Sequence, residues 1–199
     1  SSAAVAGASS GAEVLTPQTA SLYNVVYRFL ALVCANNTTL QQEVVHMLAC
    51  DAIVAPRDHG SEATGHEVDL IKTHLQMEGM NPEPLMQVVL SQNLKLNSLL
   101  GREWGRFIVT KLNSAYFSCP KGAQLIKVLC SVVRCKGRPI KEFQDHVRTL
   151  IQSNQQLLSL LEPDDMRYVD ADWDFSRLCP SDRWLLETKV ALLTLLSDL

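Results

Sequence analysis

Apolar residues recur at intervals of three and four positions along most of this chain, which is the spacing of one face of an α-helix. The clearest run follows Thr16 and Pro17, a helix-capping residue and a first-turn proline, and it predicts a helix over 17–35. Its apolar positions are Leu22, Val25, Val26, Phe29, Leu30 and Val33. The same spacing predicts further helices over 39–50, 66–78, 83–100, 102–116, 122–135, 140–162 and 181–199.

The breaks between these runs carry Asn, Gly and Pro residues. Gly101 separates two of the predicted helices, and the turn at 136–139 separates two more. The segments 51–63 and 162–180 have no sustained apolar period, so both are predicted to be loops. No window shows the alternation of a β-strand or an Asn-Gly hairpin turn, so we expect an all-α fold of about eight helices. A stacked helical array and a closed helical bundle both satisfy this pattern.

One segment resembles a known repeat family. The run Tyr27–Asn37, followed by Leu40–Val45, is similar to the final helix of an armadillo repeat and the entry to the next repeat, and Val147–Leu158 is a weaker match. In that family an apolar helix ends at Asn or Gly, and an amide-rich first turn opens the next repeat. The resemblance implies an armadillo/HEAT-like array with an extended interaction surface. No 40–47-residue period emerges, so we expect an irregular array that binds through a loop or an end.

Composition limits the class of protein. The chain has 199 residues, of which 47% are hydrophobic and 20% charged, and it carries a net charge of −3, as expected for a globular domain. We expect one helical domain over 16–199, belonging to a longer chain, after a flexible or artificially added tail over 1–15. No window reaches the ~18–20 apolar residues of a membrane span. The six cysteines lie mostly in helical patterns, which predicts reduced thiols and a cytoplasmic or nuclear location.

Charge is distributed unevenly along the chain. Residues 95–148 contain eleven basic and three acidic residues, a balance of +8, so the remainder carries −11. Such a field attracts an acidic protein segment or the phosphates of a nucleic acid, although a basic helix face is often only solvated surface. The candidate partner-binding residues are Arg102, Arg106, Lys111, Arg134, Lys136, Arg138 and Lys141.

The sequence contains no recognised catalytic motif, so no cofactor or metal is expected. Neither His59, His66 and His74 nor the set Cys119, Cys130, Cys135 and His146 has the paired spacing of zinc ligands. The acidic residues within 162–174 either neutralise the basic region of the same chain or bind a basic peptide. Their sequence lacks the glycine and the glutamate of a calcium-binding loop.

We therefore expect a protein–protein interaction scaffold or adaptor that has no catalytic activity. The first alternative is an adaptor that binds RNA or DNA through 95–148. The second is an enzyme whose site is assembled from distant residues, around Cys50 or His146.

Overall fold

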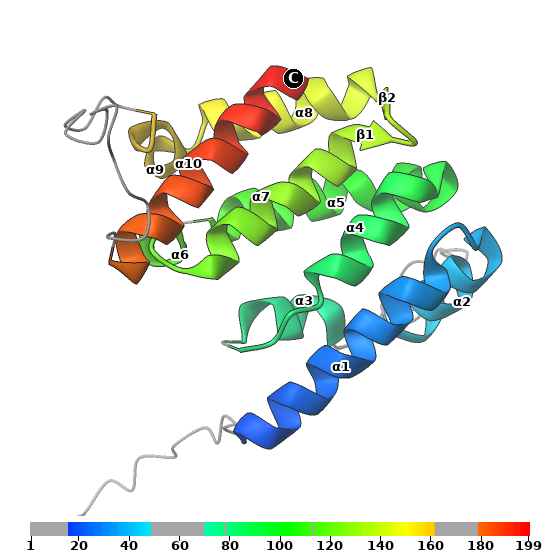
Figure 1. The fold of residues 1–199 in the computed structure, drawn as a ribbon. Helices are drawn as coiled ribbons and strands as arrows, with labels where there is room; N and C mark the ends of the chain where they lie inside the picture. Colours follow the sequence, from blue (N-terminus) through cyan, green and yellow to red (C-terminus); the bar gives the residue numbers. More distant parts are fainter. Residues whose placement is uncertain (1–15, 49–69, 78, 113, 162–178) are drawn as a thin grey trace, which may run out of the picture.

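A computed structural model of the chain describes residues 16–48, 70–77, 79–112, 114–161 and 179–199 (Figure 1). Helices make up nearly all of this part, which confirms the all-α prediction. The helices are α1 (Pro17–Cys34), α2 (Thr38–Leu48), α3 (Leu70–Gln76), α4 (Glu83–Gln92), α5 (Leu94–Lys111), α6 (Ser114–Phe117), α7 (Pro120–Val133), α8 (Lys141–Gln152), α9 (Gln155–Ser159) and α10 (Pro180–Asp198). One short antiparallel ladder joins β1 (Arg134–Cys135) to β2 (Arg138–Pro139).

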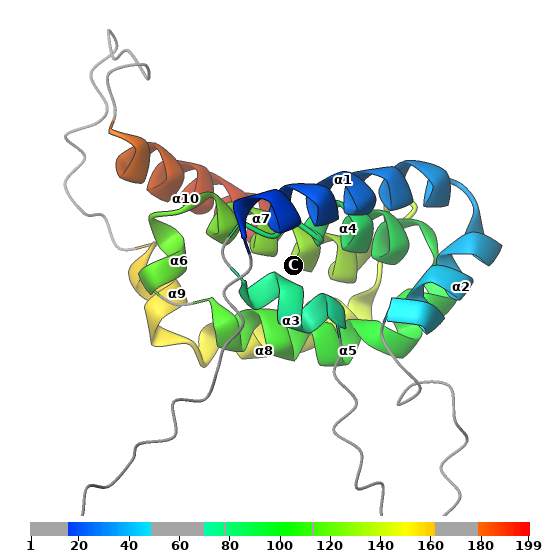
Figure 2. The ribbon, with the colours of Figure 1, turned by 90° about the horizontal axis from the view of Figure 1, so that it is seen from below.

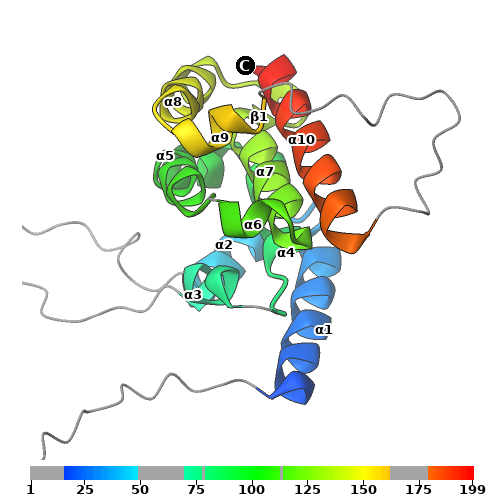
Figure 3. The same cartoon turned by 90° about the vertical axis from the view of Figure 1, so that its left-hand side faces the viewer.

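The long helices lie in two layers. Helices α1, α4, α7 and α10 follow one another in the first layer, and α3, α5 and α8 lie in the second (Figure 3). Viewed from below, α1 covers α4 while α3 and α5 lie on the opposite side of the molecule (Figure 2). Helices α1 and α10 therefore lie at opposite ends of the first layer. The armadillo/HEAT-like resemblance stays a prediction, because stacked layers alone do not define a repeating unit.

Helix α7 occupies the centre of this arrangement. It packs against α4, α5 and α10, and buried residues cover most of its circumference apart from a polar strip that includes the exposed Lys127. Its buried residues are Gly122, Ala123, Leu125, Ile126, Val128, Leu129, Val132 and Val133. A Cβ atom on Gly122 would overlap the carbonyl oxygen of Tyr116, so only glycine permits the close approach of α6 to α7.

Buried amide side chains join the helices through their main chains. The Asn97 amide donates to the carbonyl oxygens of Leu90 and Ser131 at 2.8 and 2.9 Å, which ties α5 to α4 and α7. Asn154 caps α9 and also donates to the Val109 carbonyl oxygen of α5 at 2.9 Å. Each amide satisfies backbone groups that would otherwise be buried without a partner.

Two predicted boundaries in the middle of the chain are wrong. The predicted helix 83–100 is interrupted at Asn93, whose side chain accepts from the Leu96 amide and caps α5. Gly101 does not end a helix but lies inside α5. There the absence of a side chain leaves room for the ring of Phe143. A glycine that allows close packing and a glycine that ends a helix look alike in a sequence.

Two further differences lie in the second half of the chain. The predicted helix 140–162 is divided at Ser153 and Asn154 into α8 and α9, and the predicted turn at 136–139 forms a two-strand hairpin. The predicted helix 102–116 ends at Lys111, before α6. The predictions for 1–15, 51–63 and 162–178, and for the ends of the helix 66–78, fall outside the described residues.

Four of the six apolar positions that predict α1 lie outside its buried face. Tyr27, Ala31 and Cys34 are buried against the rest of the protein. Leu22, Val25, Val26 and Phe29, which dominate the sequence pattern, are exposed. Periodicity identified the helix, but it did not identify the side that packs.

Helices α1 and α3 meet at a buried histidine. A hydrogen bond of 2.7 Å joins the Tyr27 hydroxyl to His74 Nδ1, and the Tyr23 ring packs edge-on against the imidazole. Burial, and secondarily the charge of Lys121, lowers the pKa of His74 below 6.5. The imidazole is therefore neutral in the folded protein at pH 7.

This histidine makes stability depend on pH. Below pH 6.5 the unfolded chain takes up a proton at His74 that the folded protein does not, so its contribution to the free energy of unfolding falls as the pH falls. We expect the melting temperature of the wild type to drop more between pH 7.5 and 5.5 than that of His74→Gln, measured by circular dichroism. Equal slopes for the two proteins would show that His74 is not the group responsible.

Candidate functional site

The predicted basic turn forms a hairpin with a defined geometry. Arg134 pairs with Pro139 and Cys135 with Arg138, and Lys136 and Gly137 form the turn with φ values of 49° and 74°. Two successive positive φ values are typical of a tight type I′ turn, and glycine adopts the second without strain. Outside the ladder, the Lys136 amide donates to the Ser91 carbonyl oxygen of α4 at 2.6 Å. The hairpin is thus anchored on the body of the protein. We call residues 134–141 the basic hairpin.

The cations of the basic hairpin differ in their surroundings. Arg134 forms an ion pair of 2.8 Å with Asp198 at the end of α10. Lys136, Arg138 and Lys141 are exposed, and none of them has an ion-pair partner among the described residues. Three of the four predicted hairpin residues therefore present uncompensated charge.

The three candidates on α5 are separated by the helix geometry. Arg102 forms an ion pair with Glu142, which brings it beside the start of α8 and the end of the basic hairpin. Arg106 is exposed one turn further along α5. Lys111 lies nine residues after Arg102, about two and a half turns, and so projects from the opposite side. Its ammonium nitrogen lies 6.0 Å from the centre of the Phe107 ring.

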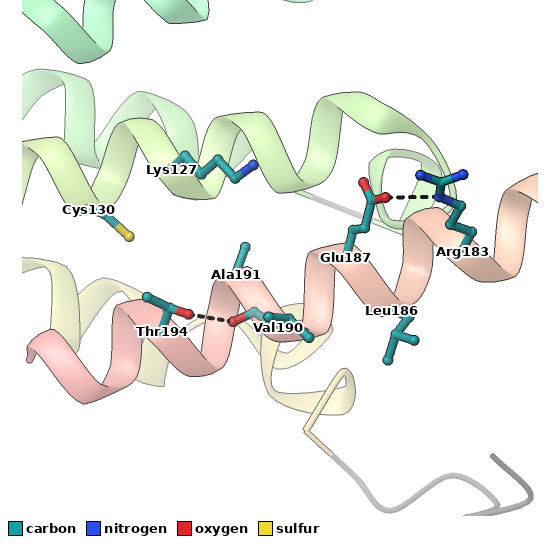
Figure 4. Close-up of a pocket in the computed structure, with 8 residues that line it drawn as sticks. All are labelled: Lys127, Cys130, Arg183, Leu186, Glu187, Val190, Ala191 and Thr194. Carbon is teal, nitrogen blue, oxygen red and sulfur yellow. Dashed lines mark hydrogen bonds and ion pairs between the residues drawn. The ribbon is translucent and has the colours of Figure 1, made fainter. Parts of the chain in front are cut away.

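A groove of about 710 Å³ separates the exposed edges of α7 and α10 (Figure 4). It is lined by Lys127, Cys130, Arg183, Leu186, Glu187, Val190, Ala191 and Thr194. Arg183 and Glu187 form an ion pair of 3.2 Å across one turn of α10, which leaves Lys127 as the cation in the groove without such a partner among the described residues. The remaining lining is mostly apolar.

Cysteine chemistry is not favoured by the surroundings of the described thiols. Burial, helped by the charge of Asp198, raises the pKa of Cys130 to about 11, and burial also raises the pKa values of Cys34 and Cys135. A nucleophilic cysteine needs the opposite shift. His146 Nε2 lies 3.3 Å from the Arg102 carbonyl oxygen.

The histidine and cysteine sets that were considered as metal ligands lie partly within the described residues. Within the described part of the chain, no group of three or more His, Cys, Asp or Glu residues is placed to hold a metal ion. Cys50, His59, His66 and the acidic segment 162–174 fall outside the described residues.

A buried ion pair was missed by the sequence analysis. The Lys121 ammonium lies 2.7 Å from the fully buried Glu83 carboxylate and also donates to the Met80 carbonyl oxygen. The pKa of Glu83 is raised by burial, and the nearby charge of Lys121 offsets only part of this increase. Lys121 also borders a second pocket, of about 740 Å³, beside Tyr116 and Trp184. No local pattern links Glu83 to Lys121, because only folding brings the first turns of α4 and α7 together.

No family model matches this chain, and neither the curated proteins nor the solved structures compared with it include a match. None of the helices in the described ranges is long and apolar enough to span a membrane.

Removing the buried cation should destabilise the fold. In Lys121→Met the carboxylate of Glu83 loses its counter-charge, and we expect a loss of about 3–5 kcal/mol in the free energy of unfolding. The double variant Glu83→Gln with Lys121→Met should recover a large part of that loss. Urea unfolding of the three proteins at pH 7 measures both values. A single variant as stable as the wild type would mean that the pair contributes nothing.

The cysteines should differ in reactivity. At pH 8 about one Cys130 thiol in a thousand is ionised, given its pKa of about 11, whereas Cys179 is exposed. We expect iodoacetamide to alkylate Cys179 at least about tenfold faster than Cys130. Mass spectrometry of the digested protein resolves the two sites. Preferential alkylation of Cys130 would instead indicate an activated thiol in the groove.

Proposed function

We propose that this chain is a protein–protein interaction module, acting as a scaffold or adaptor, which binds an acidic segment of another protein through the basic hairpin. The observation that carries this proposal is the exposure of Lys136, Arg138 and Lys141 on a hairpin anchored to α4. An anchored site loses little conformational freedom on binding, which favours affinity.

The charge distribution supports an acidic partner. The nearby acids are engaged locally, because Glu142 pairs with Arg102 and Asp198 pairs with Arg134. Among the residues that the structure describes, none is therefore left to neutralise the positive charge of the hairpin tip. The rest of the chain is strongly acidic, so an acidic ligand is attracted to the 95–148 region and repelled elsewhere.

The alternative ligand, a nucleic acid, is less well supported. Phosphates suit the same cations, but binding to single strands also uses exposed aromatic rings for base stacking. Near the basic residues, Trp104 and Phe143 are buried in the core. Their burial favours a protein ligand over a single-stranded nucleic acid.

Two coarser features agree with the proposed role. Stacked helical layers expose extended surfaces, as in armadillo/HEAT-like scaffolds. We attribute a scaffold role to this chain by analogy with them. The five described cysteines are free thiols, which supports a reducing compartment, the cytoplasm or the nucleus.

Neutralising the hairpin should weaken binding of an acidic probe. We expect the triple variant Lys136→Gln, Arg138→Gln, Lys141→Gln to bind fluorescent poly-L-glutamate about tenfold more weakly than the wild type, since exposed ion pairs contribute about 0.2–1 kcal/mol each. Fluorescence anisotropy at two salt concentrations measures the change. Arg134 is left intact because its substitution would leave the Asp198 carboxylate without its ion-pair partner.

The matched control changes net charge by the same amount at exposed positions elsewhere. Gln18→Glu, Thr39→Glu and Gln155→Glu together should bind nearly as well as the wild type. An equal loss of affinity in the two triple variants would show that net charge alone explains the weaker binding, which would contradict a hairpin site. Tighter binding of poly-uridylate than of poly-L-glutamate would support the nucleic-acid alternative.

A further inference from the structure

Helix α1 is apolar on two opposite faces. One face is buried against the protein, and the other exposes large side chains to solvent. The exposed fractions on that outer face are 65% for Leu22, 61% for Val25, 42% for Val26, 60% for Phe29 and 76% for Leu32. A helix that is apolar on both sides is typical of a buried helix, so this face is expected to be covered in the functional state.

The order of these residues indicates what covers them. Leu22, Val25, Phe29 and Leu32 follow one another at intervals of three, four and three, which is the seam of a coiled coil. The spacing is the same when read in either direction. An antiparallel copy of the helix therefore places its own seam in register with this one.

We propose that this outer face of α1 binds the same face of a second copy of the chain, with the two α1 helices antiparallel. In that register Leu22 faces Leu32 of the second copy, and Val25 faces its Phe29. A small side chain thus lies opposite a large one at both central positions, so the surface is complementary to itself. Self-complementarity is the requirement for a two-fold symmetric dimer.

The place of α1 in the fold permits this contact. Helix α1 lies at one end of the first layer, and α4 covers its inner side (Figures 1 and 3). It is 18 residues long and contains no acidic residue, and Arg28 is its single basic residue, so little charge opposes the pairing. Helix α10, at the other end, exposes only Val190 and Leu193 as large apolar residues, which makes α1 the more continuous surface.

The extent of the face predicts a reversible dimer. Its five residues together expose the equivalent of about three complete side chains per copy. An interface of that size belongs to the small end of specific interfaces, so the dimer should form and dissociate with protein concentration.

Sedimentation velocity on the full 199-residue chain under reducing conditions tests the proposal. We expect the mass to rise with concentration from 22.1 kDa toward twice that value. Val25→Glu and Phe29→Lys should each raise the dissociation constant at least about tenfold, because each places a charge against an apolar side chain. Circular dichroism checks that both variants keep their helical content, as expected for exposed positions.

The double variant tests the orientation of the helices. In an antiparallel pair, the carboxylate introduced at position 25 faces the ammonium introduced at position 29 of the other copy, so Val25→Glu with Phe29→Lys should restore most of the association. In a parallel pair, like charges would face each other and association would stay weak, which would overturn the proposed geometry.

Control variants separate this face from other surfaces. Met47→Lys on α2 and Leu193→Lys on α10 change exposed apolar residues elsewhere and should dimerise like the wild type. The proposal is overturned if the wild type stays monomeric at all concentrations or if the single α1 variants dimerise normally. It is also overturned if Leu193→Lys abolishes association, because copies would then stack α1 against α10.

Discussion

The burial of α7 is the constraint on which the rest of this structure depends. Eight of its 14 residues are buried, and they include Leu125, Ile126 and Val128, which point in three different directions around the helix. Each such side chain contributes about 1.5–3 kcal/mol when it leaves water, so the helix is stable only when neighbours cover it on nearly all sides. Helices α4, α5 and α10 provide that cover, and the two layers follow from this requirement.

The same constraint places the surface that we connect with function. Helix α7 ends at Val133, and the next residue, Arg134, has an extended backbone conformation. The chain therefore turns back in the basic hairpin, where the Ile140 amide donates to the Val133 carbonyl oxygen at 2.8 Å. Because α10 packs along α7, Asp198 lies beside Arg134 and neutralises that cation, whereas Lys136 and Arg138 have no ion-pair partner among the described residues.

The helices inside the first layer and those at its ends differ in how much of their apolar surface is buried. Helices α4 and α7 have neighbours on both sides, so their apolar surface is consumed within the protein. Helices α1 and α10 each have one neighbour in the layer. Of the two, α1 has the longer apolar outer face. The surface that we propose for self-association is therefore on α1, apart from the charged surface of the hairpin.

The sequence alone determined the all-α class, most helix starts and the clustering of basic residues at 95–148, because these depend on spacing and composition. It did not determine the break at Asn93, the role of Gly101, the Glu83–Lys121 pair or the buried side of α1. Each of these depends on residues far apart in the chain, such as Phe143 for Gly101. Only the tertiary structure decided which apolar face packs and which cations remain unpaired, since burial and ion pairing are properties of neighbours in space.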